Sequence, residues 1–308
     1  MFVSNLLGLL DIVALETVKE AVDILDTDGL APVAMQVING LDLARRIYQP
    51  GDNDIAEKLL AESAEIIGLG VYIWNVAETT ELVQLIKAIS PETIIVLGGP
   101  EISYEAEQQS LYTVADYIIT GMADLAFAEL CQDIFSATAP PQKVIHASQP
   151  PLNMIRLPYD QFTADDIANR VVYVEASRGC PFKCEFCLSS LDKTAWPFEL
   201  DRFLESMQSL YVRGVRHFKF VDRTFNLKIE ASIRILAFFL DLFQEKQDND
   251  LFLHFELIPD HLPERLKSAI KQFPAGALQF EIGIQTFNPE VQALISRKQD
   301  NQKAMENI

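Results

Sequence analysis

Cysteine is scarce in this chain: four of its 308 residues are cysteine, and three of those four lie within one short loop. So few cysteines do not build the disulfide framework of a small secreted domain. Basic residues are also in short supply, with 25 Lys and Arg against 44 Asp and Glu and a net charge of −19. A surface of that sign repels phosphate backbones, so we do not expect nucleic acid as a partner.

Long hydrophobic runs are absent as well. The two best candidates are NLLGLLDIVAL near the start and ILAFFLDLF at 235–243. Both are shorter than the ~20 residues that cross a bilayer, and both contain an aspartate. The first also lacks the basic flank and cleavage site of a signal peptide. We therefore predict a cytoplasmic protein in a reducing compartment, without a membrane partner.

No G-x-G-x-x-G dinucleotide motif occurs, yet residues 55–135 alternate between helical patterns and short, continuous apolar strands. This βαβαβα order predicts a doubly wound, Rossmann-like parallel sheet of the flavodoxin type. Ligands bind such sheets beyond the carboxyl ends of the strands, where Gly70, Gly98 and Gly99 are expected. Each glycine is equally compatible with a tight turn that involves no ligand.

The rest of the chain divides into three further stretches. Residues 1–54 read as two or three helices of unclear role, with no obvious strand. Residues 136–165 are rich in proline and are predicted to be a linker with one short strand at KVIHA. Residues 166–308 contain four consecutive βα units, the pattern of a partial (βα) barrel, ending in a helix over 288–308. Chemistry in such barrels lies at the carboxyl ends of the strands.

The clustered cysteines follow the first strand of that barrel with the spacing C-x-x-x-C-x-x-C: Cys180, Cys184 and Cys187. Cys131, on an amphipathic helix, is expected to be an ordinary core residue. A buried core does not explain three cysteines in a polar loop. Zinc or a redox dithiol is one alternative, although zinc would need a fourth ligand from a distant histidine. The other is an iron–sulfur cluster that leaves one iron open.

The segments ASRGCPFKCEFCLSS, KFVDRTFN and QFEIGIQTFNPE resemble the radical S-adenosylmethionine superfamily. Together with YIWN and VLGGPEISYE, they resemble the subgroup in which a cobalamin-binding-type domain comes first. The resemblance implies an enzyme in which Cys180, Cys184 and Cys187 ligate a 4Fe–4S cluster. One electron from a low-potential donor would then cleave S-adenosylmethionine and give a 5′-deoxyadenosyl radical, with cobalamin as a further cofactor. The substrate, a small molecule or otherwise, is not specified.

The same resemblance implies contacts for S-adenosylmethionine. Phe186 lies where the family places an aromatic residue near adenine, and Asp222 where an acceptor meets the ammonium group. Arg223 is expected to pair with a carboxylate, or with Asp222 itself. Glu256 and Gln285 are expected to hydrogen-bond ribose or substrate. The glycine edge of the first domain would face cobalamin.

Two features depart from the family pattern. No histidine has an aspartate two residues before it, so the motif Asp-x-His-x-x-Gly is missing. Either cobalamin binds without a histidine ligand, or the domain has the fold but does not bind cobalamin. The last two βα units of the barrel are also missing, and we expect the chain to be incomplete at both ends. A catalytically inactive remnant that still binds a cluster or metal is therefore the alternative function.

Overall fold

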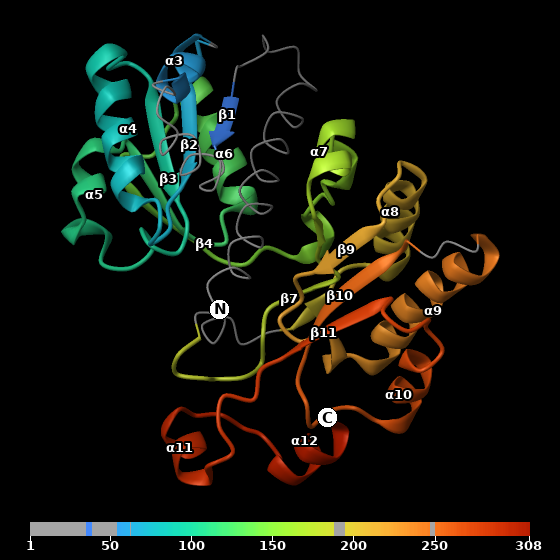
Figure 1. Ribbon diagram of the computed structural model, residues 1–308. Coiled ribbons are helices and arrows are strands. Elements are labelled where there is room, and N and C mark those ends of the chain that lie inside the picture. Colours follow the sequence, from blue (N-terminus) through green and yellow to red (C-terminus); the bar gives the residue numbers. More distant parts are fainter. Residues whose placement is uncertain (1–34, 39–53, 62, 188–194, 247–249) are drawn as a thin grey trace. The chain divides into compact units, whose positions relative to one another are not determined.

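The computed structural model describes residues 35–38, 54–61, 63–187, 195–246 and 250–308 (Figure 1). It separates into two compact units, Met1–Arg156 and Leu157–Ile308. The division falls within the stretch that the sequence predicts to be a linker.

The first unit is built on one parallel sheet. Its strands lie side by side in chain order: β1 (Met35–Ile38), β2 (Ile66–Gly70), β3 (Ile94–Gly98), β4 (Tyr117–Gly121) and β5 (Val144–Ala147). The predicted parallel α/β fold is confirmed. The strand at KVIHA is also confirmed, but it completes this sheet, so it is more than part of a linker. The expectation of helices alone in residues 1–54 is wrong at β1, and the rest of that stretch lies outside the described residues.

Helices cover both faces of this sheet. Their bounds are α3 (Asp54–Ala61), α4 (Val76–Ile89), α5 (Ser110–Val114) and α6 (Asp124–Phe135). Alternate strand residues such as Ile67 and Leu97 pack against α3, α4 and α5, whereas Ile66 and Val96 pack against α6. Cys131 of α6 belongs to this second cluster and is fully buried, as predicted. The strands read as continuous apolar runs because both of their faces are covered.

Short elements follow β5. They are the 3₁₀ turns η3 (Leu152–Met154) and η4 (Tyr159–Gln161) and the helix α7 (Ala164–Asn169). Thr163 and Asp166 form a capping box at the start of α7, each side chain bonding the other's backbone N–H. Such a box satisfies two of the free N–H groups at a helix start.

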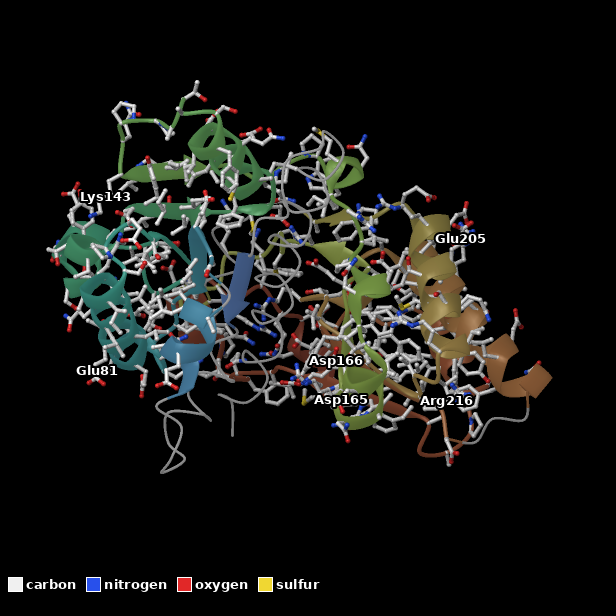
Figure 2. All side chains as sticks on the ribbon, turned by 90° about the horizontal axis from the view of Figure 1, so that it is seen from above. Glu81, Lys143, Asp165, Asp166, Glu205 and Arg216 are labelled. Carbon is white, nitrogen blue, oxygen red and sulfur yellow. The ribbon has the colours of Figure 1, made fainter. Side chains whose placement is uncertain are left out.

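The second unit carries a four-stranded parallel sheet in the order β11–β10–β9–β6. The strands are β6 (Val172–Val174), β9 (His217–Phe220), β10 (Phe252–Leu257) and β11 (Leu278–Ile282). Three helices pack on one face of it: α8 (Leu200–Val212), α9 (Ile229–Lys246) and α10 (Glu264–Ile270). The first three predicted βα units correspond to β6–α8, β9–α9 and β10–α10, and β11 begins the fourth. Figure 2 shows a charged residue of α8, Glu205, pointing away from the sheet, as an amphipathic helix requires.

Phenylalanines dominate the core between that sheet and its helices. The ring centroid of Phe255 on β10 lies 4.1 Å from that of Phe225 and 4.5 Å from that of Phe220 on β9. Phe218, Phe220, Phe239 and Phe255 are fully buried. Aromatic side chains bury much apolar surface each, so this cluster is a large part of what holds the sheet to its helices.

The C-terminal region differs from the predicted single helix over 288–308. It forms two short helices, α11 (Pro289–Leu294) and α12 (Asn301–Asn307), with a connector between them. Asn288 caps α11 and Asp300 caps α12 through their side chains. Asp300 lies inside the predicted helix, and because aspartate favours helix starts over helix interiors, its cap accounts for the break. No helix among the described residues is long and apolar enough to cross a membrane.

We predict that Phe255→Ala lowers the free energy of unfolding of the second unit by about 3 to 5 kcal/mol, because it leaves a cavity among packed rings. Urea unfolding followed by circular dichroism measures the change. Val212→Ala, at a side chain that is 74% exposed on α8, is the matched control and should change stability by less than about 0.5 kcal/mol. Similar losses in both variants would contradict this placement of the core.

Candidate functional site

The cysteine loop leaves the carboxyl end of β6, where the barrel pattern predicts chemistry. Its base is closed by a short antiparallel ribbon in which β7 (Ser177–Arg178) pairs with β8 (Trp196–Pro197). Arg178 is buried, forms an ion pair with Glu175 at 2.9 Å and stacks over the ring of Phe198. Gly179 follows with a φ of +96°, a conformation that favours glycine. The base of the loop is therefore fixed before the first cysteine.

The three clustered cysteines differ in burial and affect one another electrostatically. Cys184 is buried, while Cys180 and Cys187 are half-buried, and all are free thiols. Burial raises the pKa of Cys180, and the charges of Cys187 and Cys184 raise it further. The sulfurs are thus close enough to affect one another. Among the described residues, however, no three His, Cys, Asp or Glu side chains converge on the position of one metal ion.

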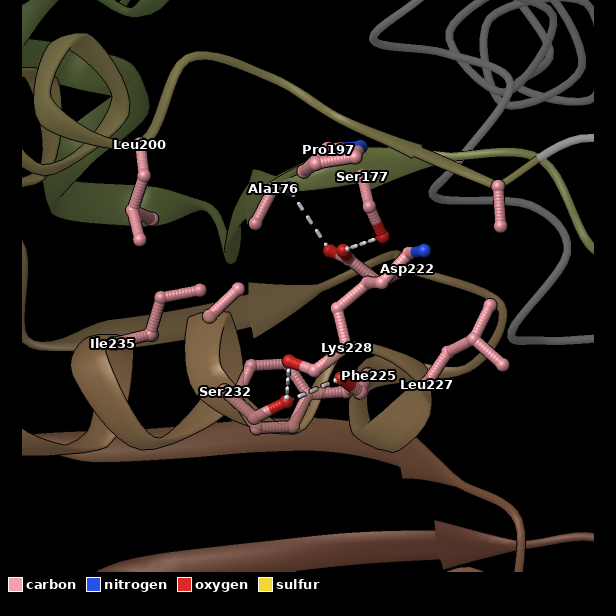
Figure 3. Close-up of a pocket in the computed structure, with 12 residues that line it drawn as sticks. Ala176, Ser177, Pro197, Leu200, Asp222, Phe225, Leu227, Lys228, Ser232 and Ile235 are labelled. Atoms are coloured by element: carbon pink, nitrogen blue, oxygen red, sulfur yellow. Dashed lines mark hydrogen bonds between the residues drawn. The ribbon is translucent and has the colours of Figure 1, made fainter.

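Asp222 lies directly beside the start of the cysteine loop, in the loop after β9 (Figure 3). Its Oδ2 accepts the backbone N–H of Ala176 at 2.9 Å, and its Oδ1 accepts the hydroxyl of Ser177 at 2.5 Å. Only 2% of Asp222 is exposed. Burial raises the pKa of this carboxyl to about 7, against the lowering effect of the Ser177 hydrogen bond. In this structure both oxygens hold the loop, rather than facing an open site.

A small pocket adjoins Asp222, between the β7–β8 ribbon and the start of α9 (Figure 3). Ser177 and Asp222 form its polar side, while Leu200, Phe225 and Ile235 are among its apolar lining. The hydroxyl of Ser232 cannot donate to a ligand in this arrangement, because it already donates to the Phe225 carbonyl at 2.7 Å. The pocket is therefore mostly apolar.

Glu256 on β10 lies close enough to Arg223, in the loop after β9, for the charge of Arg223 to affect its pKa. Burial raises the pKa of Glu256 to about 7, and the positive charge of Arg223 is the strongest effect that lowers it. Both oxygens of Asp222 are bonded to Ala176 and Ser177. The two pairings that the sequence leaves open for Arg223, with a carboxylate of the cosubstrate or with Asp222, stay predictions. A carboxyl with such a pKa exchanges a proton near neutral pH.

The face of the second sheet opposite the helices is polar, and it contains residues that sequence reasoning missed. Lys219 on β9 lies in register with Tyr173 on β6 and with His254 on β10. Lys219 and His254 are both only 7% exposed. His254 Nε2 lies 3.6 Å from Oε2 of Glu281 on β11. Burial and the charge of Lys219 lower the pKa of His254, which keeps its ring neutral at pH 7.

A signal for these residues was present in the sequence. HFKF, FLHFEL and LQFEI each place a polar residue at every second position, so that Lys219, His254, Glu256 and Glu281 share one face. Glu281 on its own gives no such signal, and the shared face becomes visible only once the strands are paired.

Two predicted contact residues lie at the surface. Phe186 is 54% exposed within the cysteine loop. Gln285 is exposed after β11 and has a φ of +66°, which is uncommon for a residue with a side chain. Backbone outliers of this kind cluster at functional sites, so the conformation of Gln285 is in keeping with its predicted role.

The two neighbouring glycines at the strand ends of the first unit, Gly98 and Gly99, differ in whether the backbone leaves space for a side chain. Gly99 has a φ of +104°, and a Cβ there would lie 2.6 Å from the Val71 carbonyl oxygen. The backbone turn alone therefore requires glycine at 99. At Gly98 the nearest atom to an added Cβ is the Ile119 oxygen at 3.6 Å, an ordinary contact. The fold leaves room for a side chain at 98, so steric crowding does not by itself require glycine there.

Gly70 and the residues after it form a tight turn at the same edge. Asn75 is fully buried, donates to the Gly70 carbonyl at 2.9 Å and accepts the Tyr72 N–H at 2.7 Å. The rings of Tyr72 and Trp74 stack with centroids 4.8 Å apart. These contacts explain the YIWN segment as a folded turn above the strand ends.

Family models match both parts of the chain. Residues 29–131 match the B12 binding domain, and residues 174–308 match the Radical SAM superfamily. The chain therefore joins a B12-binding domain to a domain of the radical SAM superfamily, and the predicted membership is confirmed. Cobalamin, a 4Fe–4S cluster and S-adenosylmethionine, the three cofactors expected from the sequence, are the cofactors that these two domains imply.

Two kinds of relative support this assignment. An uncharacterized methyltransferase of Pyrococcus horikoshii is 27% identical over 219 residues, which are 62% of this chain and 47% of the relative. Two structures of the radical S-adenosylmethionine methyltransferase TsrM from Kitasatospora setae match with TM-scores of 0.66 and 0.64 at 16% and 17% identity. The alignments cover 96% and 91% of this chain, but 60% and 57% of TsrM.

One TsrM structure contains cobalamin and a [4Fe–4S] cluster, and the other tryptophan and an S-adenosylmethionine analogue. At these identities the likeness is one of fold. The chain spans about half the length of the curated relative and about 60% of TsrM.

We predict that Asp222 makes stability pH-dependent. Its pKa rises from 3.8 in the unfolded chain to about 7 in the folded one, so the folded state holds an extra proton between those values. The free energy of unfolding should therefore fall as pH increases from about 4 to about 7, by at most ~1.4 kcal/mol per pH unit, and then level off. Asp222→Asn should remove this part of the slope, as urea unfolding at several pH values would measure.

The matched control is Asp241→Asn at an exposed position on α9, which should keep the full slope. Glu256, whose pKa also rises to about 7, contributes a similar slope that Asp222→Asn leaves in place. An unchanged pH dependence in Asp222→Asn would show that this carboxyl is not buried beside the loop.

Proposed function

We propose that this chain is the cofactor-binding part of a radical S-adenosylmethionine enzyme that uses a 4Fe–4S cluster and cobalamin. The observation that carries the proposal is the cysteine loop: Cys180, Cys184 and Cys187 lie together at the carboxyl end of β6, on a base that Asp222 and Arg178 hold in place. An inactive remnant would have no need for a loop built with this much support.

The three thiols would hold the cluster through three irons and leave the fourth iron for S-adenosylmethionine. When bound, a reduced cluster would supply the one-electron chemistry that cleaves S-adenosylmethionine at its sulfonium. A low-potential donor would provide that electron. The four free cysteines and this chemistry are in keeping with a reducing, cytoplasmic compartment.

The polar face of the second sheet would then position the bound partners. Arg223 carries a charge that suits the carboxylate of S-adenosylmethionine, and Glu256 can accept from a hydroxyl or hold a proton. Phe186 and Gln285 remain proposed contacts to adenine and to ribose or substrate. Lys219 and the His254–Glu281 pair would receive polar groups deeper on the same face.

The reaction class that we propose is methyl transfer, because the P. horikoshii relative and TsrM both carry that name. The B12-binding unit would present cobalamin at the edge formed by Gly70, Gly98 and Gly99. Cobalamin supplies methyl-group relay chemistry when bound. The substrate that receives the methyl group stays open.

We predict that anaerobic reconstitution with iron and sulfide yields a brown protein that releases 5′-deoxyadenosine from S-adenosylmethionine and dithionite. Cys184→Ala should lose the iron and at least 100-fold of the product, because one ligand to the cluster is gone. Cys131→Ala is the matched control: it removes a cysteine that is buried in α6, so iron and product should stay near wild type.

Iron analysis and chromatography of the nucleoside product measure these outcomes. Iron bound without any product would favour the inactive cluster-binding alternative. Equal iron in Cys184→Ala and wild type would contradict the assignment of the loop.

We also predict that two neighbouring glycines separate cobalamin binding from stability. Gly98→Ala should weaken cobalamin binding about tenfold and change the melting temperature little, because the fold has room for the added Cβ. Gly99→Ala should instead lower the melting temperature, because its φ and the Val71 contact both oppose a side chain. Absorbance titration with cobalamin and thermal melts of the same samples test the pair. Wild-type affinity in Gly98→Ala would contradict the proposed edge.

A further inference from the structure

The far side of the cysteine loop is held by the connector between α11 and α12, residues 295–300. The backbone N–H of Glu185 donates to the Ile295 carbonyl at 3.1 Å. The hydroxyl of Ser296 donates to Oε1 of Glu185 at 2.7 Å. The connector therefore contacts the stretch between Cys184 and Cys187 directly, although more than 100 residues separate the two in sequence.

Arg297, the next residue of the connector, reaches the cysteine itself. Its Nη1 lies 3.9 Å from Sγ of Cys184, within hydrogen-bonding range for sulfur. Its Nη2 donates to the Gly283 carbonyl, and its Nε and Nη2 lie 3.4 Å and 3.3 Å from Oε1 of Gln299. The guanidinium is thus fixed on three sides, with one edge directed at the sulfur.

The connector is itself firmly shaped. Ser296 has a φ of +53°, a left-handed conformation that is costly for a residue other than glycine. The Arg297 N–H donates to the Gln292 carbonyl at 2.9 Å, and the Gln292 side chain is buried and bonded to Thr286 and Asn301. Strain of this kind persists only where the surroundings hold it, and it commonly marks functional positions.

We propose that Arg297 is a positioning residue that fixes Cys184 and keeps a positive charge beside it, so that a bound cluster accepts its electron more readily. The inference rests on the proposed function, because it takes Cys184 as a cluster ligand. An added electron makes the cluster more negative, and a nearby cation stabilises the reduced form more than the oxidised one. Hydrogen bonds to the sulfurs and local charge are known means of setting cluster potentials.

The test compares the reduction of the cluster in four reconstituted proteins: wild type, Arg297→Gln, Arg297→Lys and Lys298→Gln. Electron paramagnetic resonance during a redox titration gives the reduced fraction at each potential. We expect Arg297→Gln to hold about tenfold less reduced cluster at a fixed potential, equivalent to a shift of about 59 mV. Lys298→Gln removes the same charge from an exposed neighbour and should titrate like wild type.

Arg297→Lys separates charge from geometry. Lysine keeps the charge but not the planar fork, so its potential should stay near wild type while its cluster loses iron to a chelator several-fold faster. If Arg297→Gln retains too little cluster to titrate, the potential and the rate of iron loss of Arg297→Lys decide the test.

The outcomes distinguish the two proposals. No cluster in the wild type would defeat the proposed function itself. A cluster in all four proteins with equal potentials and equal rates of iron loss would overturn the inference about Arg297 and leave the proposed function intact.

Discussion

The parallel pairing of β6, β9, β10 and β11 decides which way the side chains of the second unit point. Residues in register across parallel strands share a face, so one choice of register sends the phenylalanines to the helices and the charged residues to the other side. The carboxyl ends of all four strands then meet at one edge. The cysteine loop, Asp222, Arg223 and Gln285 all follow strand ends of this sheet, and their proximity depends on that single arrangement.

The cysteine loop is held at two places by groups that no single motif contains. Asp222 and Arg178 fix its base, and the connector between α11 and α12 contacts its middle. A cluster needs thiolates that are held in position, and the surrounding hydrogen bonds and charges then set its reduction potential. Arg297, beside Cys184, is a charge in position to affect that potential.

The sequence predicted the parallel sheets, the four βα units and the cysteine loop, because each depends on local periodicity or on short motifs. It did not predict β1, whose four residues are too few for a clear pattern, nor the break at 295–300, where capping by Asp300 competes with helical spacing. It also missed Arg297, Lys219 and His254. The alternating polar residues of HFKF and FLHFEL are a local signal for Lys219 and His254, but their shared face depends on which strands pair. Arg297 has no local signal, because its contact with Cys184 joins two loops that are far apart in sequence.

The central claim is that three cysteines leave one iron of a cluster open for S-adenosylmethionine. Electron paramagnetic resonance of the reduced, reconstituted protein tests it most directly, with spectra taken before and after S-adenosylmethionine is added. The account predicts that the cosubstrate changes the spectrum of the cluster, because its amino and carboxylate groups bind the open iron. An iron–sulfur signal that S-adenosylmethionine leaves unchanged at saturating concentration would contradict it.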